Sequence, residues 1–148
     1  MLTRTFRSLA VLGALAAFAA CSDTTSPYGG SVGGSYALQT VNGNTLPYSY
    51  TSGGRNISIQ NDVYTLNNDG TYSESINETV SSGGSFSPAS DAEAGTWYQS
   101  GSSIVFTPNY STQNNYAQYT GSLSNASTFS HSSITFSYNG VTWVYNHT

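Results

Sequence analysis

Residues 134–145 read ITFSYNGVTWVY, and this stretch carries the clearest structural signal in the chain. Its central pair, Asn139-Gly140, is the preferred sequence for a two-residue type I′ turn in a β-hairpin. With that turn the largest side chains fall on one face, whereas a shift of one residue would divide them between both faces. The expected partners are Tyr138 with Val141, Phe136 with Trp143, and Ile134 with Tyr145. The stretch therefore predicts an antiparallel hairpin with one buried face.

Two further turns show the same agreement between turn type and register. One is the two-residue turn Gly101-Ser102, and the other is a three-residue loop over 68–70 that ends in glycine. The expected partners are Trp97 with Phe106 and Gln99 with Ile104 around the first turn, and Leu66 with Tyr72 and Tyr64 with Glu74 around the second. Both turns therefore predict hairpins that bury aromatic and aliphatic side chains.

No stretch after residue 34 has helical periodicity, and strand and turn signals recur instead. Additional strands are expected over residues 36–41, 56–60 and 115–123. About eight short antiparallel strands joined mainly by hairpins are typical of an all-β up-and-down barrel, and a compact β-sandwich is the alternative. A closed sheet also removes exposed edges, which matters in a chain with few charged residues to protect them.

The composition fits one small acidic domain. Of 148 residues only 7% are charged, whereas 14% are aromatic, mostly tyrosine, which argues against disorder. The chain has no lysine, and two of its three arginines, Arg4 and Arg7, lie at the extreme N-terminus. Only Arg55 then remains beside seven acidic residues, so phosphate neutralisation is not available. We therefore expect neither nucleic acid nor an anionic membrane surface as a partner.

The first 20 residues have the pattern of a bacterial export signal. Arg4 and Arg7 precede an apolar run over 9–20, which is too short to span a bilayer as a helix. Phe18-Ala19-Ala20-Cys21 resembles the lipobox, which implies that the Cys21 thiol carries diacylglycerol after cleavage before it. The position of the only cysteine supports this, since a lone thiol is unusual in an oxidising compartment. The alternative is a secreted soluble protein cleaved after residues 17–19, Ala-Phe-Ala.

Three segments follow from these patterns: a signal peptide over 1–20, a lipidated Cys21 with a flexible tether over 21–34, and a β domain over 35–148. The Gly, Ser, Thr and Pro content of residues 22–34 is typical of a flexible linker. The expected address is the cell envelope. By resemblance to lipoprotein sorting rules, Ser22 after the cysteine implies the outer membrane, and the membrane itself is then a partner through the lipid.

An ordered set of motifs over the β domain resembles the small lipocalin-like lipoproteins of bacteria. The motifs are Tyr36-x-Leu38-x-x-Val41-Asn42-Gly43-x-x-Leu46-Pro47, Tyr64-x-Leu66-x-x-Asp69-Gly70-x-Tyr72, Gly95-x-Trp97 and Ile104-x-Phe106. The resemblance runs from about residue 35 to the end of the chain. It implies an eight-stranded barrel and assigns no ligand and no functional residue.

Motifs for catalysis and for metal binding are lacking. His131 and His147 have no nearby cysteine or histidine partner, so we expect them in a solvated loop and at a frayed terminus rather than on zinc. The serines are abundant, but none stands in a Gly-x-Ser-x-Gly turn. We therefore predict no cofactor, no metal and no enzymatic activity. A hydrolase that uses Glu74 or Glu78 is the weakest of the hypotheses.

The polar strand over 72–80 leaves two interpretations open. Glu74 and Glu78 share the parity of the apolar residues, so one glutamate would contact a ligand inside a barrel mouth. In the other interpretation, which we favour, Glu78 has left the core or a bulge reverses the parity. Their spacing along one strand, about 13 Å at 3.3 Å per residue, does not suit a glycosidase pair by itself.

The leading functional hypothesis is a barrel that holds a small apolar or amphipathic ligand. Its tentative binding residues are Trp97, Phe106, Phe136, Trp143 and Glu74. The rival hypothesis is a module whose interior is filled by its own aromatic residues and which binds a glycan or an envelope protein through surface Tyr and Asn. Tyr110, Tyr116 and Tyr119 are candidates for that surface, although cross-strand packing also explains them. The sequence does not fix the oligomeric state.

Overall fold

The computed structural model describes residues 32–127 and 130–148, which form ten β-strands. The signal peptide, Cys21 and most of the tether lie outside the described residues. In the part of the chain that is described, no helix has the length and apolar character needed to cross a membrane. The strands are β1 (Gly34–Val41), β2 (Asn44–Thr45), β3 (Tyr48–Ser52), β4 (Arg55–Leu66), β5 (Thr71–Ser82), β6 (Ser85–Ser100), β7 (Ser103–Ser111), β8 (Tyr119–Ser127), β9 (Ser130–Tyr138) and β10 (Val141–His147).

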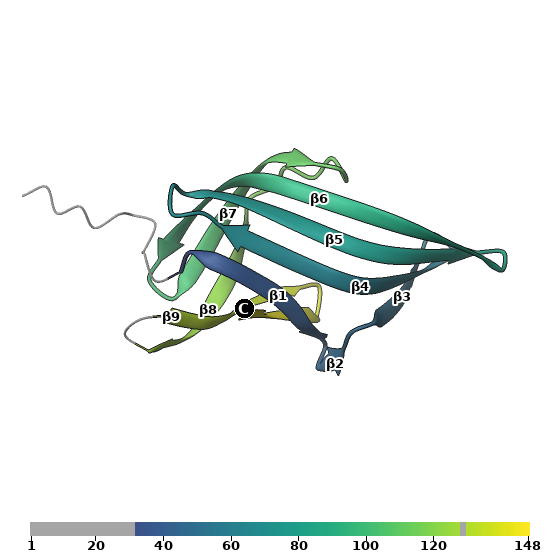
Figure 1. The fold of residues 1–148 in the computed structure, drawn as a ribbon, viewed down its shortest axis with the longest axis horizontal. Coiled ribbons are helices and arrows are strands. Elements are labelled where there is room, and N and C mark those ends of the chain that lie inside the picture. The colour runs from purple at the N-terminus through teal and green to yellow at the C-terminus, as the bar shows by residue number, and fades with distance from the viewer. Residues whose placement is uncertain (1–31, 128–129) are drawn as a thin grey trace, which may run out of the picture.

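The strands close into an antiparallel eight-stranded barrel with up-and-down order (Figure 1). Each strand from β4 to β10 pairs with the next along the chain, β10 pairs with β1, and β1 pairs with β4 to close the circle. The short β2 and β3 lie outside the barrel and pair with β1 and β4. The predicted barrel is confirmed, and the sandwich alternative was wrong.

All three predicted hairpins form in the predicted register. Trp143 pairs with Phe136, Trp97 with Phe106, and Tyr64 with Glu74. The boundaries of two other strands differ from expectation. The expected strand over 56–60 is the first part of the 12-residue β4, and the strand expected from residue 115 begins only at Tyr119. The early start was wrong because polar residues 114–118 form the loop before β8 instead.

One end of the barrel is filled by a hydrophobic core. Its fully buried large side chains include Trp97, Tyr36, Phe106, Ile104, Ile134 and Val32. Val32, which the sequence analysis placed in the tether, is fully buried and accepts a 2.8 Å hydrogen bond from the Tyr36 hydroxyl. Burial raises the pKa of this phenol to about 12, so it stays protonated and keeps donating. The domain is therefore sealed at the end where the chain enters it.

The Gly95-x-Trp97 motif belongs to this sealed end. A Cβ atom built on Gly95 would lie 2.2 Å from the carbonyl oxygen of Thr107 on β7, so only glycine allows β6 and β7 to approach this closely. Two residues on, the Trp97 indole N–H donates to the Asn67 carbonyl at 3.0 Å, and its backbone N–H donates to Gly70. The motif thus fixes β6 against the turn between β4 and β5.

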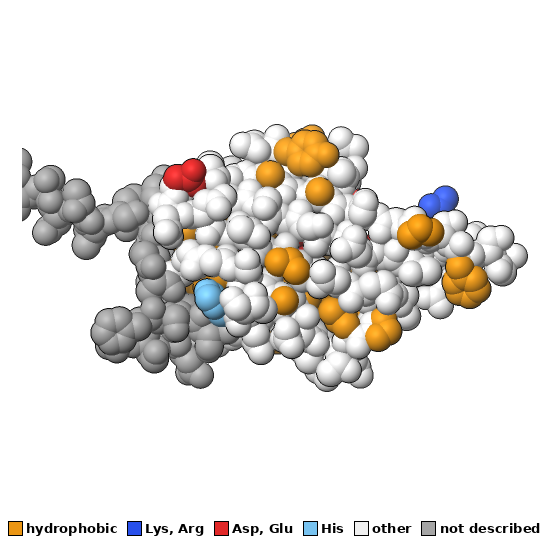
Figure 2. Space-filling model, viewed as in Figure 1, with side chains coloured by type: hydrophobic (Ala, Val, Ile, Leu, Met, Phe, Trp, Pro, Cys, Tyr) orange, Lys and Arg blue, Asp and Glu red, His pale blue; other side chains and the backbone are white. Residues whose placement is uncertain are grey.

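The opposite end of the barrel is drawn out on one side. β4, β5 and β6 are the longest strands, and in Figure 1 they extend together past the other barrel strands. Residues 82–90 at the tip of the β5–β6 hairpin are all exposed, and Phe86 is 74% exposed. Figure 2 shows a face of the molecule that carries few charged side chains and only scattered hydrophobic ones. Most of the acidic residues must therefore lie elsewhere.

Candidate functional site

A cavity of about 650 Å³ occupies the barrel at the end opposite the hydrophobic core. Its volume lies within the range of known small-molecule sites. The residues that line it come from β3 to β10 and from the loop before β8. The lining includes five acids, namely Asp62, Glu74, Glu78, Asp91 and Glu93, and seven aromatic residues, namely Tyr50, Tyr64, Tyr119, Phe136, Tyr138, Trp143 and Tyr145. Five of the seven acids of the whole sequence thus share one cavity.

The acids lie on the inner face of three neighbouring strands. Glu74 on β5 pairs with Glu93 on β6, while Ile76, two residues further along β5, pairs with Asp62 on one side and Asp91 on the other. Residues two apart on a strand face the same side, so these pairs form adjacent rows on one wall. Glu78 follows in the next row. The wall formed by β4, β5 and β6 is therefore acidic.

A β-bulge in β4 separates two of its inward-facing residues by three positions instead of two. The register between β4 and β5 shifts between Ile59 and Asn61, which adds one residue to β4. As a result Ile59 and Asp62 both face the interior, although they are three residues apart. Sequence analysis missed Asp62, but its parity with Tyr64 and Leu66 was a usable signal, since both were predicted to be buried.

The Asp62 carboxyl group is only 3% exposed. Its Oδ2 accepts a 2.6 Å hydrogen bond from the Tyr145 hydroxyl on β10, while its Oδ1 is buried without a hydrogen-bond partner. Burial raises the pKa of Asp62 to about 7, against the lowering effect of the hydrogen bond from Tyr145. Burial, and then repulsion by Asp62, raise the pKa of Glu74 well above its usual value. This pair therefore retains a proton near neutral pH.

Glu93 has a different environment, because phenols surround it. Its Oε1 accepts hydrogen bonds from the hydroxyls of Tyr72 at 2.6 Å and Tyr119 at 2.5 Å. The Tyr119 hydroxyl also lies 3.0 Å from that of Tyr64. Burial raises the pKa of all three phenols, so they remain donors. Glu93 is thus held in place by neutral groups from β5 and β8.

Asp91 is held by the loop between β7 and β8. Its two carboxyl oxygens accept hydrogen bonds from the Thr112 hydroxyl at 2.9 Å and from the Gln113 side-chain amide at 2.7 Å. The backbone N–H of Thr112 also donates to Ala92 on β6. These contacts fix one side of the loop to the acidic wall at the mouth of the cavity.

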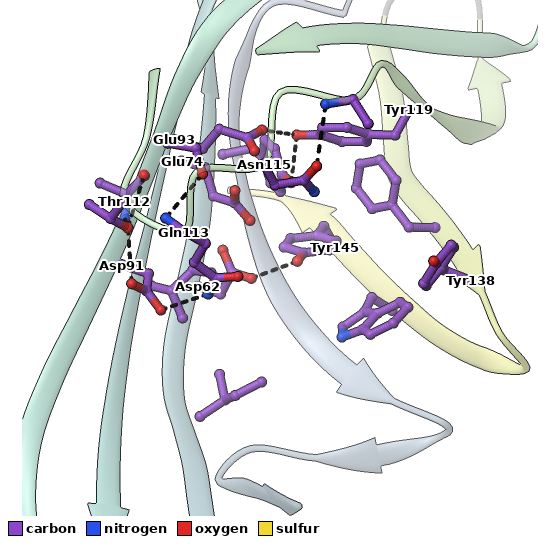
Figure 3. A pocket seen from close by; sticks show the side chains of 18 of the residues that line it. Asp62, Glu74, Asp91, Glu93, Thr112, Gln113, Asn115, Tyr119, Tyr138 and Tyr145 are labelled. Carbon is purple, nitrogen blue, oxygen red and sulfur yellow. Dashed lines mark hydrogen bonds between the residues drawn. The ribbon is translucent and has the colours of Figure 1, made fainter. Parts of the chain in front are cut away.

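An aromatic wall stands opposite the acidic one. Phe136 on β9 and Trp143 on β10 are cross-strand partners, and Tyr145 lies two residues further along β10 on the same face. The centroid of the Phe136 ring lies 5.5 to 5.7 Å from those of Tyr64, Phe106, Tyr119 and Tyr145. The rings of Tyr64 and Tyr145 also meet each other, at 5.1 Å. Figure 3 shows Asp62, Glu74, Asp91 and Glu93 on one side and Tyr119, Tyr138 and Tyr145 on the other.

The five tentative ligand-binding residues divide between the two ends of the barrel. Glu74, Phe136 and Trp143 line the cavity. Trp97 and Phe106 are 1% and 0% exposed and lie in the core that seals the other end. Cys21, the expected lipidation site, lies outside the described residues.

Three expectations about polar residues need correction. Glu78 does not leave the core: β5 keeps its alternation through Glu78, which is 9% exposed and lines the cavity. His147 is not at a frayed end, since it pairs with Tyr36 across β10 and β1 and the two rings meet edge to face at 5.1 Å. The backbone of His131 lies in β9 rather than in a loop. These strands are longer than the local turn signals suggested.

Of the three tyrosines considered for a binding surface, two are exposed and one lies in the cavity. Tyr110 and Tyr116 are each 53% exposed, whereas Tyr119 turns into the cavity and donates to Glu93. Within residues 32–127 and 130–148, no three His, Cys, Asp or Glu side chains are grouped so that they would hold a metal ion.

Comparison with known protein families and with curated proteins finds no match to this chain. The cavity is therefore the feature of this chain that bears most directly on its function.

Proposed function

We propose that this chain is an exported, lipid-anchored barrel that holds a small amphipathic ligand without transforming it. The observation that carries the proposal is the cavity of about 650 Å³ with an acidic and an aromatic wall. A barrel with a closed end and an open, lined end is compatible with a ligand-holding cup. Ligand affinity would come from burial of an apolar body, and orientation from the polar wall.

The proposed localisation follows from the N-terminal leader and not from the barrel. Lipidation of Cys21 would anchor the domain in the envelope, with the outer membrane as the proposed location. Several acyl chains, at about 0.8 kcal/mol per buried CH₂, hold a protein on a membrane stably. The described domain begins only 11 residues after that cysteine, at Val32, so the barrel would remain close to the bilayer.

Native mass spectrometry tests the ligand-holding function. The chain is expressed with its leader, released from the envelope fraction in mild detergent, and measured without a denaturing step. A discrete added mass, lost on denaturation and recovered in an organic extract, is the expected result. A bare mass that stays bare after incubation with lipids and aromatic metabolites contradicts the proposal.

A matched pair of variants places the ligand. Ile76 lies on the inner face of β5 and lines the cavity, whereas Val80 lies further along the same strand and does not. Ile76→Trp fills the cavity and should abolish the added mass, whereas Val80→Trp should preserve it. Equal adducts on both variants would show that the ligand binds outside the cavity.

A second candidate function rests on the outer surface. Four large aromatic side chains that do not line the cavity are at least 44% exposed, namely Phe86, Tyr98, Tyr110 and Tyr116. Tyrosine supplies contact area at low entropic cost, as in many protein and glycan interfaces. A surface module of this kind would leave the cavity empty, so the same mass measurement separates the two functions.

A further inference from the structure

The electrostatics of the cavity are one-sided. Five acidic side chains line it, and none of the lining residues is lysine, arginine or histidine. Tyrosine hydroxyls, Thr112 and Gln113 supply neutral donors to three of the acids, but these groups carry no charge. Buried carboxylates without a cationic partner are unfavourable, so the cavity is complementary to a positively charged guest.

A buried hydrogen-bond acceptor, Oδ1 of Asp62, indicates where a positively charged group would bind. Oδ1 of Asp62 has no hydrogen-bond partner although Asp62 is only 3% exposed, and Asp62 lines the cavity. Glu74 lies diagonally across the β4–β5 ladder from it, because Glu74 pairs with Tyr64, two residues away. Two carboxyl groups side by side require a shared donor, and either a proton or an ammonium group supplies one.

The opposite wall suits an apolar body attached to that ammonium. The Tyr145 hydroxyl donates a hydrogen bond to Asp62. Trp143 lies on the same face of β10, two residues nearer the hairpin turn. Phe136 is paired with Trp143. A cation at Asp62 would therefore have aromatic rings beside it, which adds cation–π attraction to the ion pair.

We propose that the cavity binds a small primary amine with an aromatic or apolar body, its ammonium group between Asp62 and Glu74 and its body against Phe136 and Trp143. This inference rests on the proposed ligand-holding function and names the ligand class. A neutral polyol would supply hydrogen bonds but would leave the charges uncompensated. A divalent cation would require a tighter set of ligands than the described acidic residues form.

Proton exchange gives the proposal a signature. Alkylammonium groups titrate near pH 10, so the guest stays charged at neutral pH. Because binding displaces the proton held by Asp62 and Glu74, affinity should rise by up to about tenfold per pH unit from pH 5.5 to 7 and then level off. The titratable groups that face Asp62 are Glu74 and Glu78 on β5, Asp91 and Glu93 on β6, Tyr64 on its own strand, Tyr119 on β8 and Tyr145 on β10.

The experiment is isothermal titration of the full chain, stripped of ligand by unfolding and refolding, with three probes that differ in charge. The probes are tryptamine, the neutral tryptophol and the anionic indole-3-acetate. Tryptamine should bind at least tenfold more tightly than tryptophol, and indole-3-acetate should not bind. Binding enthalpies measured at pH 6.5 in phosphate and in MES, neither of which is a primary amine, should differ, because one proton passes to the buffer.

Variants link the preference to the site. Asp62→Asn should weaken tryptamine binding at least tenfold and leave tryptophol binding unchanged. It should also abolish the pH dependence of tryptamine affinity. Asp69→Asn is the matched control, because Asp69 lies in an exposed turn outside the cavity, and it should bind as the parent does. Glu74→Gln gives a second test at the site should Asp62→Asn fold poorly.

Each failure has a distinct meaning. Equal binding of tryptamine and tryptophol overturns the amine inference and leaves the ligand-holding function standing. Tighter binding of Ca²⁺ or Mg²⁺, with displacement of tryptamine, overturns it in favour of a metal. If no probe binds, the amine inference falls, and a bare native mass then removes the ligand-holding function as well.

Discussion

Replacing Asp62 with asparagine is expected to stabilise the ligand-free barrel at pH 8. The pKa of Asp62 rises from 3.8 to about 7 in the folded state, chiefly through burial. At 1.36 kcal/mol per pKa unit, the difference corresponds to about 4 kcal/mol between the protonated and the ionised forms. Asparagine keeps an acceptor for Tyr145 without the charge, so the variant should gain about 2–4 kcal/mol in free energy of unfolding.

The direction of the pH dependence follows from the same shift. The folded state binds the Asp62 proton more tightly than the unfolded state does, so the contribution to stability is complete below pH 4 and is lost as pH rises toward 7. Glu74 and Glu78, whose pKa values are also raised by burial, act in the same direction. The ligand-free protein should therefore be more stable at pH 5 than at pH 8, and Asp62→Asn should reduce that difference.

Urea unfolding followed by tryptophan fluorescence at pH 5, 6, 7 and 8 measures both effects. Asp69→Asn is the control, since the hydrogen bonds from Thr71 lower the pKa of Asp69 and its removal should weaken the turn. A parent protein equally stable at pH 5 and pH 8, together with an Asp62→Asn variant that is less stable at pH 8, would refute the account of this carboxyl group.

Three further perturbations have defined outcomes. Tyr145→Phe removes the donor that lowers the pKa of Asp62, so this pKa should rise further and tryptamine affinity at pH 7 should fall several-fold by calorimetry, with little change at pH 9. Gly95→Ala should destabilise the fold by about 2 kcal/mol or more in urea unfolding, because the new Cβ meets a backbone carbonyl; an unchanged midpoint contradicts the close approach of β6 and β7. Cys21→Ser should abolish incorporation of radiolabelled palmitate and move the protein to the soluble fraction, and retained labelling would exclude this anchor.

The barrel was predictable because its turns and its apolar alternation agree. The Asn139-Gly140 turn sets the register of β9 and β10, and the large residues then fall on one face. Closure of the sheet was inferred only from strand number and order. β1 and β4 are separated in the chain by β2 and β3, which lie outside the barrel, and no local signal in β1 or β4 specifies their pairing.

The candidate site was predicted less completely. Phe136 and Trp143 were assigned to the cavity on aromatic character alone, which does not distinguish them from Trp97 and Phe106 in the sealed core. Which end of a barrel is filled depends on packing across all its strands, and single hairpins do not reveal it. Glu78 was misjudged because acidic residues are rarely buried, whereas here the buried acids cluster.

The acidic wall depends on strand pairing rather than on any motif. Asp62 and Asp91 lie far apart in sequence and meet only because Ile76 pairs with both. The bulge between Ile59 and Asn61 was also invisible, since no glycine or proline marks it. Once the registers are known, both features follow directly.

The most direct test of the account is a crystal structure of the protein with tryptamine. Electron density for the amine is expected inside the open end of the barrel, with its nitrogen within hydrogen-bond distance of the Asp62 and Glu74 carboxyl groups and its indole ring against Phe136 and Trp143. Tryptamine bound only on the outer surface, or a cavity closed by its own side chains at saturating amine, would show that this barrel does not hold a ligand in its cavity.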